Sequence, residues 1–240
     1  MKEGYIIDYI SGLEVKATPE EVDAVQIFAK ILVEDYGYSK DVIITHPQYR
    51  VKVRPSDEKK EYPVEDYLRF SKAQLGVWFN GEERFFIRKY EKDGKVLFNE
   101  IPNIPKFGQR IEDIGMFKRA DLKPTHNLKA TFKAIRNHLA ANTVGATRVE
   151  VLAQQLINLI FCKIYDERFT EPSEIVTFRA GVDEDAAEIQ KRILELFEKV
   201  KRKYKEVMDV NDSITLDTKL IVYVVGELQN YCLNPVITRA

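Results

Sequence analysis

The stretch EYPVEDYLRFSKAQLGVWFNGEERFF, Glu61–Phe86, changes character twice. Its first four residues are typical of the entry to a strand, and Glu65 to Lys72 predicts a short helix. LGVWF then predicts a strand, and Asn80-Gly81 is a turn signal that joins it to a second strand, RFFIRKY. The abrupt change near Val64-Glu65 raises the question of whether a segment is missing there.

Upstream of this stretch, a helix is predicted from Thr18 to Gly37. Thr18 can cap the helix, Pro19 suits its first position, and Glu21 completes a capping box. Two β-rich runs, DVIITH and YRVKVR, follow and predict a hairpin. The apolar face of the helix is expected to contain Val22, Val25, Ala29, Leu32 and Tyr36.

Downstream, Asp93-Gly94 predicts a turn into a third strand, KVLFNEI, and the rest of the chain predicts helices. These cover residues 127–141, 147–169, 184–208 and 217–233. The second is nearly all apolar, but its Gln, Asn and Lys residues indicate a buried core helix rather than a membrane span. The predicted class is α/β (α+β), with a first domain over residues 1–118 and an all-α domain over residues 119–240.

The bulk composition indicates a soluble globular protein of 240 residues, with 45% apolar and 31% charged residues. A net charge of −1 excludes a global field that attracts polyanions. Residues 81–148 are more basic, with 14 Lys/Arg against 8 Asp/Glu, which either marks a polyanion site or an ordinary solvated surface. Cys162 and Cys232 lie in apolar runs, which predicts free thiols in a cytoplasmic protein.

Catalytic motifs are scarce in this sequence. The three histidines are far apart and form no metal-binding spacing, and there is no phosphate-binding P-loop. Glu14-Val15-Lys16 matches the E-x-K tripeptide of Mg²⁺-dependent nucleases, in which the carboxylate holds the metal and the lysine helps to activate water. Such triplets also occur by chance, and this one precedes the first helix instead of lying in a central strand.

The predicted hairpin after Trp78 interleaves basic and aromatic residues. Alternation along the strand places Arg84, Phe86 and Arg88 on one face. Such a face can bind nucleic acid, although its long side chains can equally cover apolar surface. Our candidates for phosphate contacts are Arg84, Arg88, Lys89, Lys118, Arg119 and Lys123.

Several collinear segments resemble restriction–modification proteins. Gly12–Val53 resembles the N-terminal PD-(D/E)xK nuclease-like domain of type I restriction enzyme R proteins, and Gly76–Lys89 and Asn99–Gln109 look like the back half of that domain. The region from Arg119 resembles the helical domain that precedes the core of adenine-N6 DNA methyltransferases. Its most specific piece is LAQQLINLIFCKIYDERF, Leu152–Phe169.

The departures from the family concern both catalytic centres. The family's catalytic aspartate position is taken by Glu65, and its E-x-K strand has no counterpart. Tyr67 matches the tyrosine of the family's Q-x-x-x-Y helix, but the glutamine position is Pro63. Glu21 is a candidate for the acidic residue of the family's first helix. The S-adenosylmethionine loop and the N-P-P-[YF] motif are also missing, which makes the chain look internally shortened and C-terminally truncated.

The resemblance implies a protein that binds DNA or docks to methyltransferase and specificity subunits, and that is catalytically inactive alone. Mg²⁺ and S-adenosylmethionine are implied for the full-length family only, and no metal site is expected here. Two alternatives stay open: a Mg²⁺-dependent endonuclease with an altered site built from Glu14, Lys16 and Glu21, with Tyr67 as a further candidate, and an interaction module without DNA affinity. No membrane association is expected. A homodimer through exposed strand edges is a further prediction.

Overall fold

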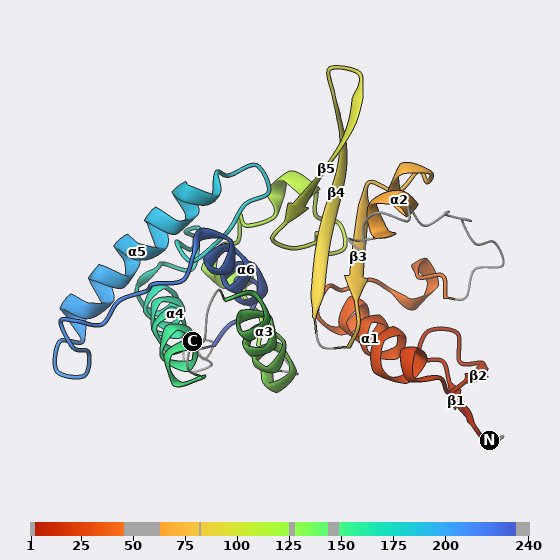
Figure 1. Ribbon diagram of the computed structural model, residues 1–240, viewed down its shortest axis with the longest axis horizontal. Helices are drawn as coiled ribbons and strands as arrows, with labels where there is room; N and C mark the ends of the chain where they lie inside the picture. The colour runs from red at the N-terminus through yellow and green to blue at the C-terminus, as the bar shows by residue number, and fades with distance from the viewer. Residues whose placement is uncertain (1–2, 46–62, 82, 125–127, 144–148, 234–240) are drawn as a thin grey trace. The chain divides into compact units, whose positions relative to one another are not determined.

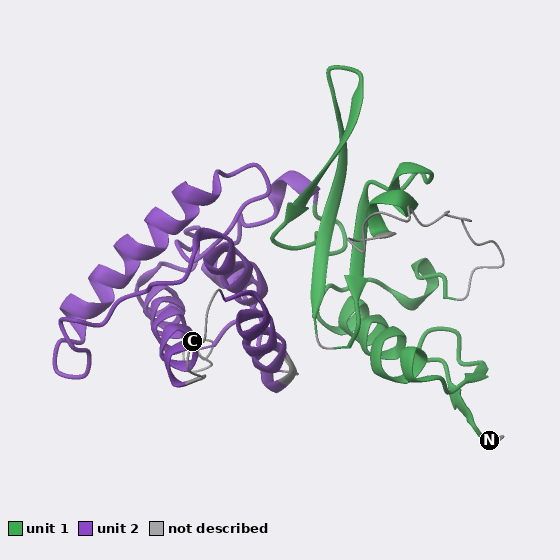
Figure 2. Ribbon diagram, viewed as in Figure 1, with its two compact units in different colours: residues 1–109 green, residues 110–240 purple. Residues whose placement is uncertain are grey.

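The computed structural model describes residues 3–45, 63–81, 83–124, 128–143 and 149–233. The chain divides into two compact units, residues 1–109 and 110–240 (Figure 2). Small antiparallel sheets and short helices build unit 1, and longer helices build unit 2, so the fold is α+β. The predicted domain boundary lies at residue 118, whereas residues 110–118 belong to unit 2 in the structure.

The described part of unit 1 contains two antiparallel sheets (Figure 1). One is a three-stranded meander in which β4 lies between β3 and β5, as the sequence predicts. Asp93 and Gly94 both have positive φ, 52° and 70°, which suits the tight turn between β4 and β5. The strands are β1 (Tyr5–Ile7), β2 (Glu14–Lys16), β3 (Leu75–Phe79), β4 (Arg84–Lys92) and β5 (Lys95–Ile101).

The first helix begins with a π-helical segment, η1 (Glu21–Val25), and continues as α1 (Gln26–Glu34). Thr18 accepts a hydrogen bond from the Glu21 amide at 3.2 Å, so the predicted cap is present. The predicted apolar face is wrong at its start, because Val22 and Val25 are exposed while Glu21 and Gln26 are buried. The π-helical turn has a spacing of five residues, which rotates the buried face away from these valines.

Glu61–Phe86 contains no change from strand to helix at Val64-Glu65. Helix α2 (Pro63–Arg69) begins at Pro63, a residue that suits a first helical turn, and continues through that position. The helix contacts β3 at Gly76, where an added Cβ would lie 2.5 Å from Val64 Cγ1. Residues 61 and 62 and the run YRVKVR lie outside the described residues. The other predicted strand, DVIITH, is wrong over residues 41–45, where a 3-10 turn (Lys40–Val42) is followed by irregular backbone.

The described part of unit 2 contains the four predicted helices, with α5 and α6 shorter than expected. Because α5 ends at Lys203, Val207 does not extend its buried stripe and is 75% exposed. Asp185 and Asp217 cap the two helices by accepting hydrogen bonds from Ala187 N and Leu220 N. The helices are α3 (Leu128–Asn142), α4 (Val149–Phe169), α5 (Ala186–Lys203) and α6 (Thr218–Leu228).

The core of unit 2 lies between these helices and contains fully buried side chains from all four, such as Ile135, Leu159, Ile193 and Val224. The segment before α3 is attached by β-bridges, Lys118 to Ile175 and Lys123 to Tyr231. Across the part of the chain that the structure describes, none of the helices combines the length and apolar composition that crossing a bilayer requires.

Candidate functional site

The candidate nuclease residues occupy separate local structures. Glu14 and Lys16 are exposed on β2, which pairs with β1 in a two-stranded sheet and is not a central strand. Glu21 is buried and accepts a hydrogen bond from Gln26 Nε2 at 2.7 Å. Tyr67 lies on α2 and is 48% exposed. Among the described residues, no group of three or more His, Cys, Asp or Glu side chains could hold a metal ion.

Asp8, a buried carboxylate that the sequence does not predict, lies beside the first helix, η1 and α1. Asp8 accepts hydrogen bonds from the Ser11 amide and hydroxyl, from Gln26 Nε2 at 2.8 Å and from Thr45 Oγ1 at 3.0 Å. Burial acts to raise the pKa of Asp8, but these hydrogen bonds outweigh it and hold the pKa well below its usual range. Gln26 thus bridges Asp8 and Glu21, which fixes the π-helical segment against the loop after β1.

The basic side chains of the predicted hairpin have structural surroundings. Arg84 is only 5% exposed, and its guanidinium carbon lies 5.7 Å from the centre of the Phe86 ring. The Lys89 ammonium donates to the carbonyl oxygens of Leu68 and Ser71, at 2.8 and 2.6 Å, and so caps the end of α2. Arg88 is half-buried on β4. A phosphate therefore has little access to Arg84, and Lys89 is already bonded.

The remaining candidates for phosphate contacts lie in unit 2, on the segment that its β-bridges hold. Lys118 and Lys123 are exposed on either side of a 3-10 turn, η4 (Arg119–Asp121). Arg119 instead points toward the protein, because its Nη1 donates to the Glu167 carbonyl at 3.3 Å. Two of these three side chains are thus open to an anionic ligand.

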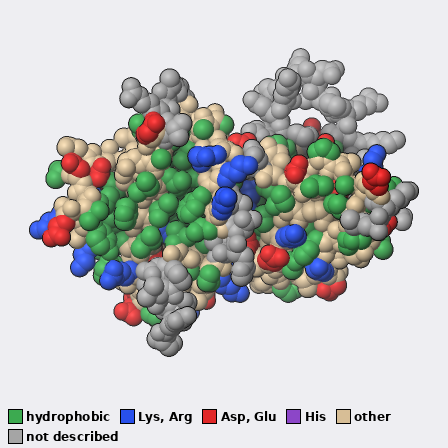
Figure 3. Space-filling model, turned by 90° about the horizontal axis from the view of Figure 1, so that it is seen from below, with side chains coloured by type: hydrophobic (Ala, Val, Ile, Leu, Met, Phe, Trp, Pro, Cys, Tyr) green, Lys and Arg blue, Asp and Glu red, His purple; other side chains and the backbone are tan. Residues whose placement is uncertain are grey.

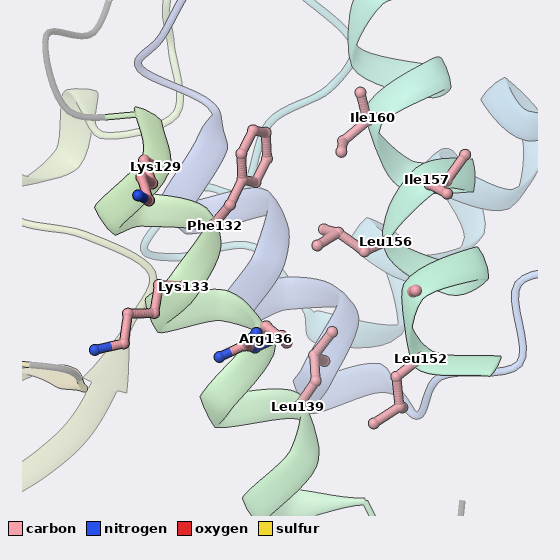
Figure 4. A pocket seen from close by; sticks show the side chains of 10 residues that line it. Lys129, Phe132, Lys133, Arg136, Leu139, Leu152, Leu156, Ile157 and Ile160 are labelled. Carbon is pink, nitrogen blue, oxygen red and sulfur yellow. The ribbon is translucent and has the colours of Figure 1, made fainter. Parts of the chain in front are cut away.

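An apolar groove lies between α3 and α4 in unit 2 (Figure 4). It encloses about 700 Å³. In Figure 4, Leu156 and Ile160 point from α4 toward α3, which faces them with Phe132 and Leu139. The groove is lined by Lys129, Phe132, Lys133, Arg136, Leu139, Leu152, Ala153, Leu156, Ile157 and Ile160.

The groove exists because α4 is apolar on two faces. Its inner face supplies Leu159 and Cys162 to the core. Its outer face carries Leu156, Ile157 and Ile160, of which Ile157 is 43% exposed and the other two are half-buried. The prediction of a buried core helix is therefore correct for only one side of α4. These outer side chains line the groove, where no other element of the described residues covers them. Figure 3 shows hydrophobic side chains gathered on one face of unit 2, beside Lys and Arg side chains.

Polar groups on the inner face of α4 fix its rotation. Gln155 donates to the Ser213 carbonyl at 3.0 Å and accepts from the Thr215 amide at 2.6 Å. Asn158 donates to the same carbonyl at 3.3 Å. Because these buried groups would lose their hydrogen bonds if the helix turned, Ile157 is held outward.

The α3 side of the groove is held by a stacked pair of rings. His138 lies on Tyr223 of α6, with ring centres 3.6 Å apart, and its ring faces Asn142 Nδ2 at 3.3 Å. Burial lowers the pKa of His138 to about 4, against a smaller opposing effect of Asp217. The imidazole is therefore neutral near pH 7, and α3 is packed without a buried charge at this point.

A buried ion pair anchors the far end of α4. Lys163 Nζ lies 3.0 Å from Glu167 Oε1, and both side chains are almost fully buried. Burial lowers the pKa of Lys163, and the neighbouring Glu167 carboxylate opposes that effect. Glu167 also accepts hydrogen bonds from the Leu233 amide, so the pair connects α4 to the chain after α6.

The sequence signal that could have revealed the groove is the lack of a continuous polar face in residues 149–169. From the same pattern we predicted a helix that is buried in the core. Comparison with known proteins gives no match: no family model, no curated protein and no solved structure matches this chain.

Proposed function

We propose that this protein is a component of a restriction–modification assembly in the cytoplasm, and that its helical unit docks onto a methyltransferase or specificity subunit. The supporting observation is the groove between α3 and α4, whose α4 wall is aliphatic, with Ile157 exposed and Leu156 and Ile160 half-buried. In this proposal unit 1 is an abbreviated restriction-endonuclease-like domain, and the chain is catalytically inactive alone.

Docking through the groove follows from the physical chemistry of its lining. Exposed, contiguous apolar side chains have a free-energy cost in water, and covering them with a partner removes it. The neighbouring cations Lys129, Lys133 and Arg136 give such a contact a polar rim, as protein interfaces normally have.

DNA contact is a second candidate function, favoured by the exposure of Lys118 and Lys123. β-Bridges hold the backbone of both residues, and their side chains are exposed. Charge reversal of both should weaken duplex binding and reduce its dependence on salt by roughly two phosphate contacts. Unchanged binding would leave the interaction module without DNA affinity as the better description.

The endonuclease alternative has the least support, because Glu14, Lys16, Glu21 and Tyr67 lie in the separate local environments described above. Incubation of the chain with supercoiled plasmid and Mg²⁺ or Mn²⁺ tests it directly. Nicking that is lost in Glu21→Gln and Lys16→Ala variants would restore this alternative.

Docking is tested by co-expressing the chain with adenine-N6 methyltransferase and specificity subunits encoded in the same genome. The expected result is a complex in size-exclusion chromatography that Ile157→Glu disrupts and Val210→Glu does not. Val210 is the matched control because it is an exposed valine of unit 2 outside the groove, 89% exposed. Absence of any complex with either subunit would refute the docking function.

A further inference from the structure

We infer that the occupant of the α3–α4 groove is an amphipathic α-helix of a partner protein, with a row of Asp or Glu residues along its α3 side. This inference rests on the proposed docking function and specifies its partner. It is carried by the shape of the groove, its aliphatic lining and the position of its cations.

The shape fits a helix. The lining of α4 runs from Leu152 to Ile160, a rise of about 12 Å, and that of α3 from Lys129 to Leu139, about 15 Å. Two or three turns of an incoming helix match this length. Such helices bind by anchors at i, i+3 or i+4 and i+7, which bury one apolar stripe between the two walls.

The aliphatic lining favours a protein over a nucleic acid. Leu152, Leu156, Ile157 and Ile160 offer neither hydrogen bonds to phosphates nor stacking faces to bases. Phe132 is the single aromatic residue among the residues that line the groove. Apolar anchors of a peptide gain from this surface because their burial removes area from water on both partners.

The charged residues of the groove all lie on its α3 side. Lys129, Lys133 and Arg136 follow one another at i, i+4 and i+7 on α3, where all three are exposed, and the groove residues of α4 are uncharged. Arg136 also donates to Asn137 at 3.3 Å, which leaves its other guanidinium nitrogens for a partner. Carboxylates on one side of the incoming helix would complement this row and fix its orientation.

Charge complementarity also argues against the groove of a second copy of this chain as the occupant. A second groove would bring the same three cations and no acidic residue from its lining. Like charges of the two copies would then face one another in a partly desolvated contact, which is unfavourable. A partner with its own acidic row avoids that cost.

The test uses two synthetic helical peptides of about five turns, which share one Leu face and differ only in Glu or Lys beside it. Fluorescence anisotropy measures their binding to the full chain. We expect the Glu peptide to bind at least tenfold more tightly than the Lys peptide, with an advantage that shrinks in high salt. The double variant Lys133→Glu/Arg136→Glu should reverse this preference, and Lys199→Glu, an exposed cation of α5, should leave it unchanged.

Ile157→Glu should weaken both peptides at least tenfold, and Val210→Glu should weaken neither. Circular dichroism melts of each variant show whether it folds. If Ile157→Glu fails to fold, the preference of the Lys133→Glu/Arg136→Glu double variant between the two peptides still tests the inference, because both substituted side chains are exposed. Equal binding of the two peptides, or binding of neither, would overturn the acidic-helix inference. The docking function would still stand if a subunit co-purifies with the wild type and Ile157→Glu disrupts that complex. In that case only the acidic-helix inference would have failed.

Discussion

Buried polar side chains determine much of the local geometry on which the groove depends. Gln155 and Asn158 hold the rotation of α4, and the Lys163–Glu167 pair anchors its end. In unit 1, Gln26 plays a similar part between Asp8 and Glu21. Each of these groups is costly to leave unpaired, so truncating one partner should cost more than its hydrogen bond contributes.

His138 should make unit 2 sensitive to mild acid. Its folded pKa of about 4 lies below the ordinary value of 6.5, so between these values the unfolded chain binds more protons. Stability should therefore fall as pH drops from about 6.5 to about 4 and then level off, by at most about 3 kcal/mol. His138→Phe keeps a ring against Tyr223 and should flatten this part of the profile. Urea melts of both proteins at several pH values measure the difference, and parallel profiles would contradict the assignment.

Arg84→Glu should destabilise unit 1 rather than act as a DNA-contact variant. The substitution would place a carboxylate in a site that is 5% exposed, at an expected cost of about 3 kcal/mol or more. Arg88→Glu, at a half-buried position of the same strand, should cost clearly less. Thermal melts compare the two variants. Wild-type stability in Arg84→Glu would show that the Arg84 side chain can reach solvent.

Among the secondary-structure elements, the hairpin strands illustrate what local sequence can predict. Asn80-Gly81 and Asp93-Gly94 specify turns through backbone chemistry that acts within four residues, so β3, β4 and β5 follow the prediction. The π-helical segment η1 was beyond such prediction because Asp8, 18 residues before Gln26, holds it in place. The start of α2 was not predicted, because Pro63 suits the first turn of a helix as well as the entry to a strand.

For the candidate site too, local sequence predicts the composition of an element but not its packing. The composition of residues 149–169 gives the apolar character of α4, but which of its sides the core covers depends on α3, α5 and α6. Sequence alone could not show that Arg84 is buried or that Lys89 caps α2, since both depend on packing between separate elements. Lys118 and Lys123 were predicted to be available to a ligand, and they are exposed.

Two turn glycines should respond differently to alanine. At Gly81, with φ of 95°, an added Cβ would lie 2.2 Å from the Asp23 carbonyl oxygen, so the hairpin turn could no longer lie against η1. At Gly94, with φ of 70°, nothing lies within 4 Å, and only the left-handed backbone carries a cost of about 1 kcal/mol. Gly81→Ala should therefore lower the free energy of unfolding by about 2 kcal/mol more than Gly94→Ala. Equal losses in denaturant melts would argue against the contact between the turn and η1.

At the scale of the whole molecule, unit 1 has a strand edge and unit 2 has a helix face that the described residues leave uncovered. In unit 1, β5 pairs with β4 alone among the described strands, and Val96 and Leu97 on β5 are exposed. An unpaired edge of this kind invites strand pairing with a second copy. In the described part of unit 2, the outer face of α4 lacks a cover. Both features are consistent with the proposed docking and with the dimer that the sequence predicts.

Self-association through β5 should be visible in solution. Sedimentation velocity is expected to show a dimer whose fraction rises with concentration, and Val96→Lys should lower that fraction because lysine on an edge strand opposes pairing. Val210→Lys is the matched control in unit 2. A monomer at every concentration would exclude this dimer and would leave the docking function of unit 2 untouched.

The affinity of the full chain for a complex of methyltransferase and specificity subunits tests the docking function most directly. Titration calorimetry of the wild type, Ile157→Glu and Val210→Glu should give a loss of at least tenfold for Ile157→Glu, equivalent to about 1.4 kcal/mol, and no loss for Val210→Glu. Equal affinities for all three proteins, with all three folded, would contradict docking through the α3–α4 groove.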